Sequence, residues 1–163
     1  MSKQTKNVFI SHIHEDDAGL AKLKGLLEEN GMAIRDRSIR SDNPNNAHSK
    51  DYIKSEILGP RIRQSGVLVV YISPETKDSK WVDWEIEYAQ KQDKRIVGVW
   101  AHGQKGCEIP QALKDYADAI VGWMGNRIIE AINGKIDGWQ NPDGTSVSPR
   151  DIKRYDCKLR RVH

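Results

Sequence analysis

The chain has 163 residues, of which 37% are hydrophobic and 30% charged, a composition typical of a globular domain large enough to bury a core. No apolar run reaches the roughly 18 residues that a membrane-spanning helix needs, and residues 1–6 lack the apolar stretch of a signal peptide. We therefore expect a cytoplasmic protein without a membrane partner. With only Cys107 and Cys157, and no cysteine or histidine near them at ligand spacing, we expect neither a disulfide nor a metal site.

The net charge is only +3, and residues 150–163 alone contribute +4, from six basic and two acidic residues, which leaves the rest of the chain about neutral. Such a segment can bind nucleic acid or acidic partners. A solvated terminus is the favoured explanation of the same charges, so nucleic acid is not an expected partner.

The predicted elements begin with a short strand over 7–11, an apolar run rich in β-branched side chains. Acidic residues at 15–17, followed by leucines at helical spacing, predict a helix that ends before Gly31. A second short strand is expected over 32–36, and a polar loop over 37–49.

Apolar residues between 52 and 58 predict a second helix, disturbed at Gly59-Pro60. Residues 66–73 form the most apolar run, and its lack of alternation is typical of a strand buried on both faces of a parallel sheet. The remaining predictions are a helix over 80–92, a strand over 95–100, a helix over 111–116, a strand over 119–123 and a helix over 127–132.

This alternation of strands and helices predicts an α/β fold: a flavodoxin-like, doubly wound, five-stranded parallel sheet with helices on both faces, in three αβα layers. After residue 138 the sequence becomes polar, with a turn expected over 141–144. We therefore predict a main domain over 1–138 and a polar, basic C-terminal appendage over 139–163.

Ligands of open parallel sheets bind beyond the carboxyl ends of the strands. The loops there begin near residues 11, 36, 73 and 101, and they contain neither GxxxxGK[ST] nor GxGxxG. The carboxylates and lysine of a response-regulator receiver are also missing from their places, and acidic residues after the first strand would repel a flavin phosphate.

The helix over 80–92 contains one misplaced carboxylate. At about 100° per residue, Glu85 falls within the apolar face that contains Trp81, Trp84 and Tyr88, whereas Asp83 and Glu87 lie opposite and are expected to face water. A carboxylate on an apolar face costs free energy unless it is paired or functional. Two interpretations stay open: Glu85 pairs with a buried arginine or caps a neighbouring helix, or it is a catalytic group with a shifted pKa.

One carboxylate is sufficient for cleavage of NAD at the nicotinamide–ribose bond. The nicotinamide leaves as a neutral molecule, so no general acid is needed, unlike in ordinary glycoside hydrolysis. What remains is to hold the ribose and stabilise an oxocarbenium-like transition state beside an aromatic surface. Arginines at 35, 37 and 40 can meet the diphosphate, although solvated loop charges explain them as well.

Three segments together resemble the Toll/interleukin-1-receptor (TIR) superfamily, and specifically its bacterial TIR-like branch found in Thoeris-type antiphage systems. Residues 7–12, Asn-Val-Phe-Ile-Ser-His, resemble the opening D-V-F-I-S-Y box, and residues 31–37 resemble the second box, where a strand leads into the BB loop. Trp81-x-x-x-Glu85 matches W-x-x-x-E. The chain departs from the family at Asn7, where aspartate is usual, in lacking the BB-loop Pro-Gly pair, and in showing no final Phe-Trp box.

The resemblance implies an NAD glycohydrolase or cyclase that releases nicotinamide and makes a signal nucleotide from ADP-ribose. NAD is then the substrate rather than a cofactor, Glu85 the catalytic residue, and the implied partners are further copies of the chain and a separate nucleotide-sensing effector. The expected substrate-binding residues are Ser11, His12, Arg35, Arg37, Trp81 and Trp84. The alternative is a non-enzymatic TIR-like adaptor that acts through protein–protein contacts.

Overall fold

The computed structural model describes residues 4–13, 16–36, 58–101, 108–140 and 146–147. Its centre is a sheet whose strands are ordered β2-β1-β3-β4-β5-β6-β7. The first five in the chain, which adopt the predicted flavodoxin-like order, are β1 (Gln4–Ser11), β2 (Met32–Asp36), β3 (Val67–Ile72), β4 (Arg95–Trp100) and β5 (Ala119–Val121). All pairings among these five strands are parallel, as predicted.

The predicted number of five strands is wrong, because the described part of the sheet contains two more. β6 (Gly138–Gln140) pairs in parallel with β5, and β7 (Ser146–Val147) pairs antiparallel with β6. β6 is three residues long and has no apolar run, so its pattern gives little signal for a strand. The boundary predicted after residue 138 falls inside this strand.

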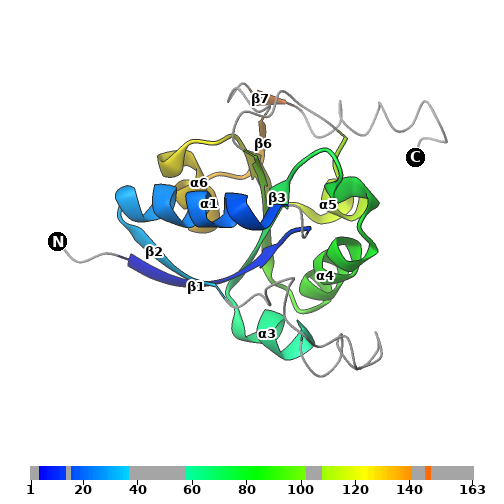
Figure 1. Ribbon diagram of the computed structural model, residues 1–163. Coiled ribbons are helices and arrows are strands. Elements are labelled where there is room, and N and C mark those ends of the chain that lie inside the picture. The colour runs from blue at the N-terminus through cyan, green and yellow to red at the C-terminus, as the bar shows by residue number, and fades with distance from the viewer. Residues whose placement is uncertain (1–3, 14–15, 37–57, 102–107, 141–145, 148–163) are drawn as a thin grey trace.

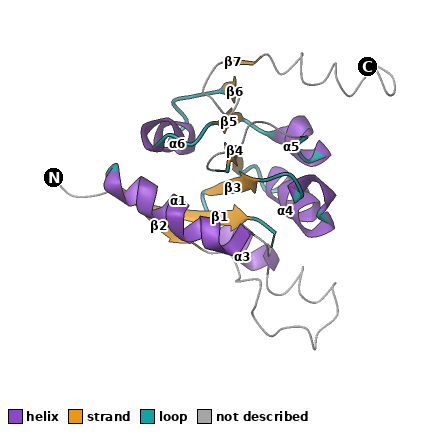
Figure 2. Ribbon diagram, turned by 45° about the horizontal axis from the view of Figure 1, so that its top comes forward, coloured by secondary structure: helices purple, strands orange, loops and turns teal. Residues whose placement is uncertain are grey.

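Helices cover both faces of the sheet, which confirms the three-layer prediction (Figure 1). α1 (Asp17–Glu29) and α6 (Gly125–Ile132) cover one face, and α4 (Lys80–Lys91) and α5 (Gln111–Tyr116) cover the other (Figure 2). The short helix α3 (Gly59–Gln64) packs beside α4. None of the described helices is long and apolar enough to cross a membrane.

β3 divides the core into two apolar clusters, and all six of its residues are buried. Val67, Val69 and Tyr71 face the cluster formed with α1 and α6, whereas Leu68, Val70 and Ile72 face the cluster formed with α4 and α5. This burial on both faces is what the unbroken apolar run predicted.

Residues Gly59 and Pro60 do not disturb a helix as expected; they form the first turn of α3. A proline fits there, because the first backbone N–H groups of a helix have no partner inside it. The other residues predicted for this helix, between 52 and 57, lie outside the described residues.

Candidate active site

Glu85 lies on the buried face of α4, as its place on the helical wheel predicted. The helix starts after β3 and is capped by Ser79, whose hydroxyl accepts a hydrogen bond from the backbone N–H of Val82 at 3.2 Å. Two turns of helix then place Val82, Glu85, Ile86 and Ala89 against the sheet. Glu85 is only 8% exposed, so its carboxyl group lies in a largely apolar setting.

The carboxyl group of Glu85 is held by Ser11, the last residue of β1. The Ser11 hydroxyl donates a hydrogen bond of 2.6 Å to Oε1 of Glu85, and Ser11 itself is 1% exposed. One interpretation of the sequence was that Glu85 pairs with a buried arginine. Among the described residues, its hydrogen bond comes instead from the hydroxyl group of a serine. A short contact between two buried groups fixes the carboxyl group at the carboxyl end of β1.

Burial changes the acidity of Glu85. Removal from water raises the pKa of its carboxyl group from 4.5 to about 8, and the hydrogen bond from Ser11 opposes part of that rise. The group is thus a neutral acid over much of the ordinary pH range, ready to ionise when a positive charge comes near.

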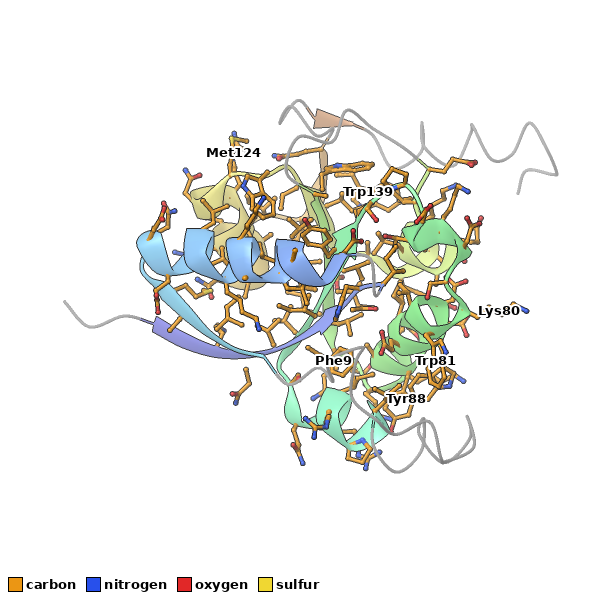
Figure 3. All side chains as sticks on the ribbon, viewed as in Figure 1. Phe9, Lys80, Trp81, Tyr88, Met124 and Trp139 are labelled. Carbon is orange, nitrogen blue, oxygen red and sulfur yellow. The ribbon has the colours of Figure 1, made fainter. Side chains whose placement is uncertain are left out.

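Aromatic side chains of α4 lie on one side of Glu85. Trp81 and Trp84 are half-buried and pack against the core cluster on this face of the sheet. Trp84 stacks on Tyr88, with ring centroids 5.0 Å apart and an interplanar angle of 17°. Figure 3 shows Trp81 and Tyr88 on the same side of α4, the side on which the Tyr88 hydroxyl accepts a hydrogen bond from Arg63 of α3. An aromatic stripe therefore follows the helix between Glu85 and α3.

The opposite side of the helix is less exposed than expected. Glu87 is exposed, but Asp83 is half-buried rather than facing water. Burial, followed by repulsion from Glu87, raises the pKa of the Asp83 carboxyl group.

Of the other predicted substrate-binding residues, those that the structure describes lie at different distances from Ser11. The His12 ring is half-buried next to Ser11, and its Nδ1 donates a hydrogen bond of 3.0 Å to the Ile10 carbonyl oxygen. Arg35 is in β2 beside Asn7, four residues before Ser11 in the register, so its backbone lies well back from the carboxyl end of β1. Arg37, like Arg40, lies outside the described residues.

A second polar group, which the sequence analysis did not identify as part of the site, lies at the same end of the sheet. Ser73 follows β3, and its hydroxyl donates a hydrogen bond of 2.6 Å to Oδ2 of Asp16, just before α1. Thr76 approaches the Ser73 hydroxyl at 3.1 Å. The only sequence signal for this cluster was a serine placed where a buried strand ends. Among the described residues, no group of three or more His, Cys, Asp or Glu side chains could hold a metal ion.

Solved structures that are similar to the chain share low identity with it. The TIR domain of the Toll-related receptor TRR-2 from Hydra magnipapillata is 21% identical, with a TM-score of 0.49, over 78% of this chain and 91% of that one. The Clostridium botulinum CMP N-glycosidase BcmB is 20% identical, with a TM-score of 0.41, over 58% and 71%. A conserved protein from Enterococcus faecalis V583 is 13% identical, with a TM-score of 0.44, over 93% and 99%. These similarities are too distant to say what this chain does, and no curated protein matches it.

A family model gives the assignment. The model described as "Thoeris protein ThsB, TIR-like domain" matches residues 9–106, more than half of the 163 residues. The matched range contains Ser11, Asp16, Ser73 and Glu85, so the whole polar edge of the sheet falls within it. The chain therefore belongs to the family of TIR-like domains of the Thoeris protein ThsB.

Proposed function

We propose that this protein cleaves NAD between nicotinamide and ribose, with Glu85 as the catalytic residue. The observation that carries the proposal is the buried carboxyl group of Glu85, held by Ser11 at the carboxyl end of the parallel strands. Ligands of such sheets bind at that edge. A buried carboxyl group with a raised pKa, beside aromatic rings, is a combination that catalytic sites use more often than purely structural ones.

The reaction requires little of the protein beyond charge and position. The bond between ribose C1′ and the nicotinamide nitrogen breaks, and its electron pair leaves with the nitrogen, so a cationic ring departs as neutral nicotinamide. The ribosyl cation that remains is stabilised by the Glu85 carboxylate. Water then adds at C1′ and loses a proton to give ADP-ribose, or an atom of the same molecule adds and loses a proton to give a cyclic product.

The acidity of Glu85 fits a substrate whose leaving group, the nicotinamide ring, carries a positive charge. Without a ligand, a pKa of about 8 keeps the carboxyl group mostly neutral near pH 7. The positive nicotinamide ring favours the ionised form when it binds, because an opposite charge nearby lowers the pKa of a carboxyl group. The Ser11 hydroxyl then stabilises the carboxylate through the hydrogen bond it already donates.

We assign roles in substrate binding to the other predicted site residues. Trp81 lies one turn before Glu85 and offers a ring surface to the nicotinamide or the ribose, with Trp84 extending that surface. His12 borders the site next to Ser11. Arg35 and Arg37 are assigned to the diphosphate on the chemistry of their guanidinium groups alone, since the backbone of Arg35 lies back from the carboxyl end of β1 and Arg37 is outside the described residues. As a member of a Thoeris family, the protein would supply the nucleotide product as a signal to a separate effector during phage infection, with self-association completing the active state.

The test compares two substitutions two residues apart on α4. Glu85→Gln removes the buried ionisable group, whereas Glu87→Gln removes an exposed one and serves as the matched control. We expect the wild type and Glu87→Gln to release nicotinamide from NAD at equal rates, and Glu85→Gln to be slower by about a hundredfold or more. Mass spectrometry of the products identifies the nucleotide, and circular dichroism confirms that both variants are folded.

Equal nicotinamide release by the wild type and Glu85→Gln would rule out Glu85 as the catalyst. A wild-type protein that releases no nicotinamide, even under crowding that promotes assembly, while binding a specific protein partner, would favour the adaptor function instead.

A further inference from the structure

The carboxyl ends of β1 and β3 are joined by a hydrogen bond outside the Ser11–Glu85 pair. Asp16 precedes α1 and Ser73 follows β3, 57 residues later, and the two side chains meet at 2.6 Å. β1 and β3 are neighbours in the sheet, so this bond ties together the two loops that leave them. These are the loops that border Glu85.

On the β3 side, a continuous series of hydrogen bonds runs from Ser73 to the start of α4. The backbone N–H of Ser73 donates to the Thr76 hydroxyl at 2.9 Å, and the Thr76 N–H donates back to the Ser73 carbonyl at 3.1 Å. The Ser79 N–H donates to the Thr76 carbonyl at 3.1 Å, and Ser79 is the residue that caps α4. Glu85 lies on the same helix, six residues after Ser79. These hydrogen bonds therefore connect Ser73 to the start of the helix that contains Glu85.

On the β1 side, Asp16 closes the loop that begins with Ser11 and His12. The Asp16 N–H donates to the Ile13 carbonyl at 2.9 Å, while the His12 ring is tied to the Ile10 carbonyl at 3.0 Å. Ser11 ends β1 and Glu85 lies on α4, so the Asp16–Ser73 contact joins the loop that follows Ser11 to the segment that leads into the helix of Glu85.

We propose that Asp16 is a positioning residue for Glu85: by binding Ser73, it fixes the loop after β1 against the loop before α4 and keeps the carboxyl group beside Ser11. The proposal rests on the proposed function for its kinetic consequence. Asp16 acts through the two loops and has no role in touching the substrate. A misplaced catalytic group costs far more in turnover than in binding, because the geometry of the transition state is the more demanding.

The experiment uses the full chain and a matched control at the other end of the sheet. Asp118 also holds a strand with its carboxyl group, accepting a hydrogen bond of 2.9 Å from the backbone N–H of Ile96 at the start of β4. Asp16→Ala and Asp118→Ala therefore each remove one carboxyl group that bridges two segments, and only the first lies at the candidate site. Asp16→Asn retains an oxygen that can accept the Ser73 hydrogen bond.

We expect Asp16→Ala to lower kcat for nicotinamide release about tenfold or more, with KM changed by less than about threefold. Asp118→Ala is expected to keep kcat, and Asp16→Asn to recover most of the lost rate. Ser73→Ala should reproduce the effect of Asp16→Ala. The double variant should be no slower than either single one, because both substitutions remove the same contact. Thermal unfolding of each variant verifies that the folded protein is being assayed.

A second measurement needs no turnover and so separates this proposal from the proposed function. In protein labelled with carbon-13 at glutamate side chains, the Glu85 carboxyl resonance is identified by its absence in Glu85→Gln. We expect it to shift in Asp16→Ala and to stay in place in Asp118→Ala. A Glu85 resonance unmoved by Asp16→Ala would overturn the positioning role, and so would a kcat equal to that of Asp118→Ala. A wild type without nicotinamide release would overturn the proposed function alone.

Discussion

Glu85 occupies a core position where an apolar side chain would stabilise the fold better than a carboxyl group does. Its neighbours on the buried face of α4, Val82, Ile86 and Ala89, stabilise the core by leaving water. A carboxyl group in the same position loses hydration and, among the described residues, regains the hydrogen bond from Ser11. The folded protein tolerates the group most easily when it carries its proton, and this preference has a consequence for stability that can be measured without any substrate.

The stability of the wild type should depend on pH through Glu85. Below pH 4.5, both the folded and the unfolded chain hold the proton, and nothing is lost. Between pH 4.5 and about 8, the unfolded chain releases the proton while the folded chain keeps it, so folding becomes less favourable as pH rises. The slope from this group approaches about 1.4 kcal/mol per pH unit. Urea unfolding across this range should therefore show Glu85→Gln gaining stability over the wild type as pH rises.

Glu87→Gln provides the reference for that series, because it keeps the Glu85 carboxyl group and removes an exposed charge whose repulsion acts on Asp83. We expect it to retain the loss of stability that Glu85 causes as pH rises. Curves for Glu85→Gln and the wild type that stay parallel from pH 4.5 to 8 would show that the buried carboxyl group does not have the raised pKa given by its surroundings.

The sequence was sufficient to place Glu85 on the buried face of its helix, because a helical wheel needs only local spacing. It also named Ser11 as part of the site, but not as the residue that binds Glu85. That contact joins residues 74 positions apart and depends on how far β1 extends relative to α4. The Asp16–Ser73 contact was missed for the same reason: acidic residues before a helix are ordinary helix punctuation, and only the sheet register brings one of them to Ser73.

At the scale of elements, α1 shows how a helix is fitted to the sheet. Gly19 lies over β3, where the hydroxyl oxygen of Tyr71 occupies the space that a side chain would need: a Cβ atom at Gly19 would be 2.1 Å from it. Gly25 is on the same helix, and a Cβ atom there would have no neighbour within 4 Å. Gly19 thus allows α1 to pack closely on Tyr71. Gly25 makes no such contact possible and only lowers the helix propensity of α1.

These two glycines should respond to alanine with opposite signs. Gly25→Ala is expected to stabilise the protein by about 0.5–1 kcal/mol, because alanine has the higher helix propensity. Gly19→Ala carries the same gain but must displace the Tyr71 ring, so we expect net destabilisation of about 1–3 kcal/mol. Denaturant unfolding of both variants measures the difference. If Gly19→Ala were as stabilising as Gly25→Ala, the close packing of α1 on Tyr71 would be contradicted.

The strands most easily predicted were those with strong local signals. β3 is an unbroken apolar run and β4 has no polar residue after Arg95, and the bounds of both differ from the predicted ones by no more than a residue at each end. β6 is defined instead by its partners: Ala119 and Ile120 of β5 pair with Gly138 and Trp139. A three-residue strand of this kind cannot be distinguished from a loop until the edge it joins is known.

For the whole molecule, β6 extends the sheet beyond β5 on the side away from β2, and β7 pairs with its outer edge. Trp139 is 5% exposed and belongs to the core cluster between the sheet and the helices α4 and α5. Its indole N–H donates a hydrogen bond to the Ala117 carbonyl at 3.4 Å. The Trp100 indole N–H donates to the Gln140 carbonyl at 2.7 Å. Trp100 ends β4, so β6 also supports the strand end that leads toward the candidate site.

A chain that ends at residue 138, where the change in composition suggested a boundary, should therefore be less stable than one that ends at 147. The shorter chain loses Trp139 from the core and leaves the Trp100 N–H without the Gln140 carbonyl, and truncating a buried tryptophan alone costs about 3–5 kcal/mol. Trp139→Ala in the full chain separates the packing contribution from the loss of the strand. Denaturant unfolding of the three proteins should place both altered chains below the chain ending at 147. Equal stability of the chains ending at 138 and 147 would mean that β6 adds nothing to the free energy of unfolding.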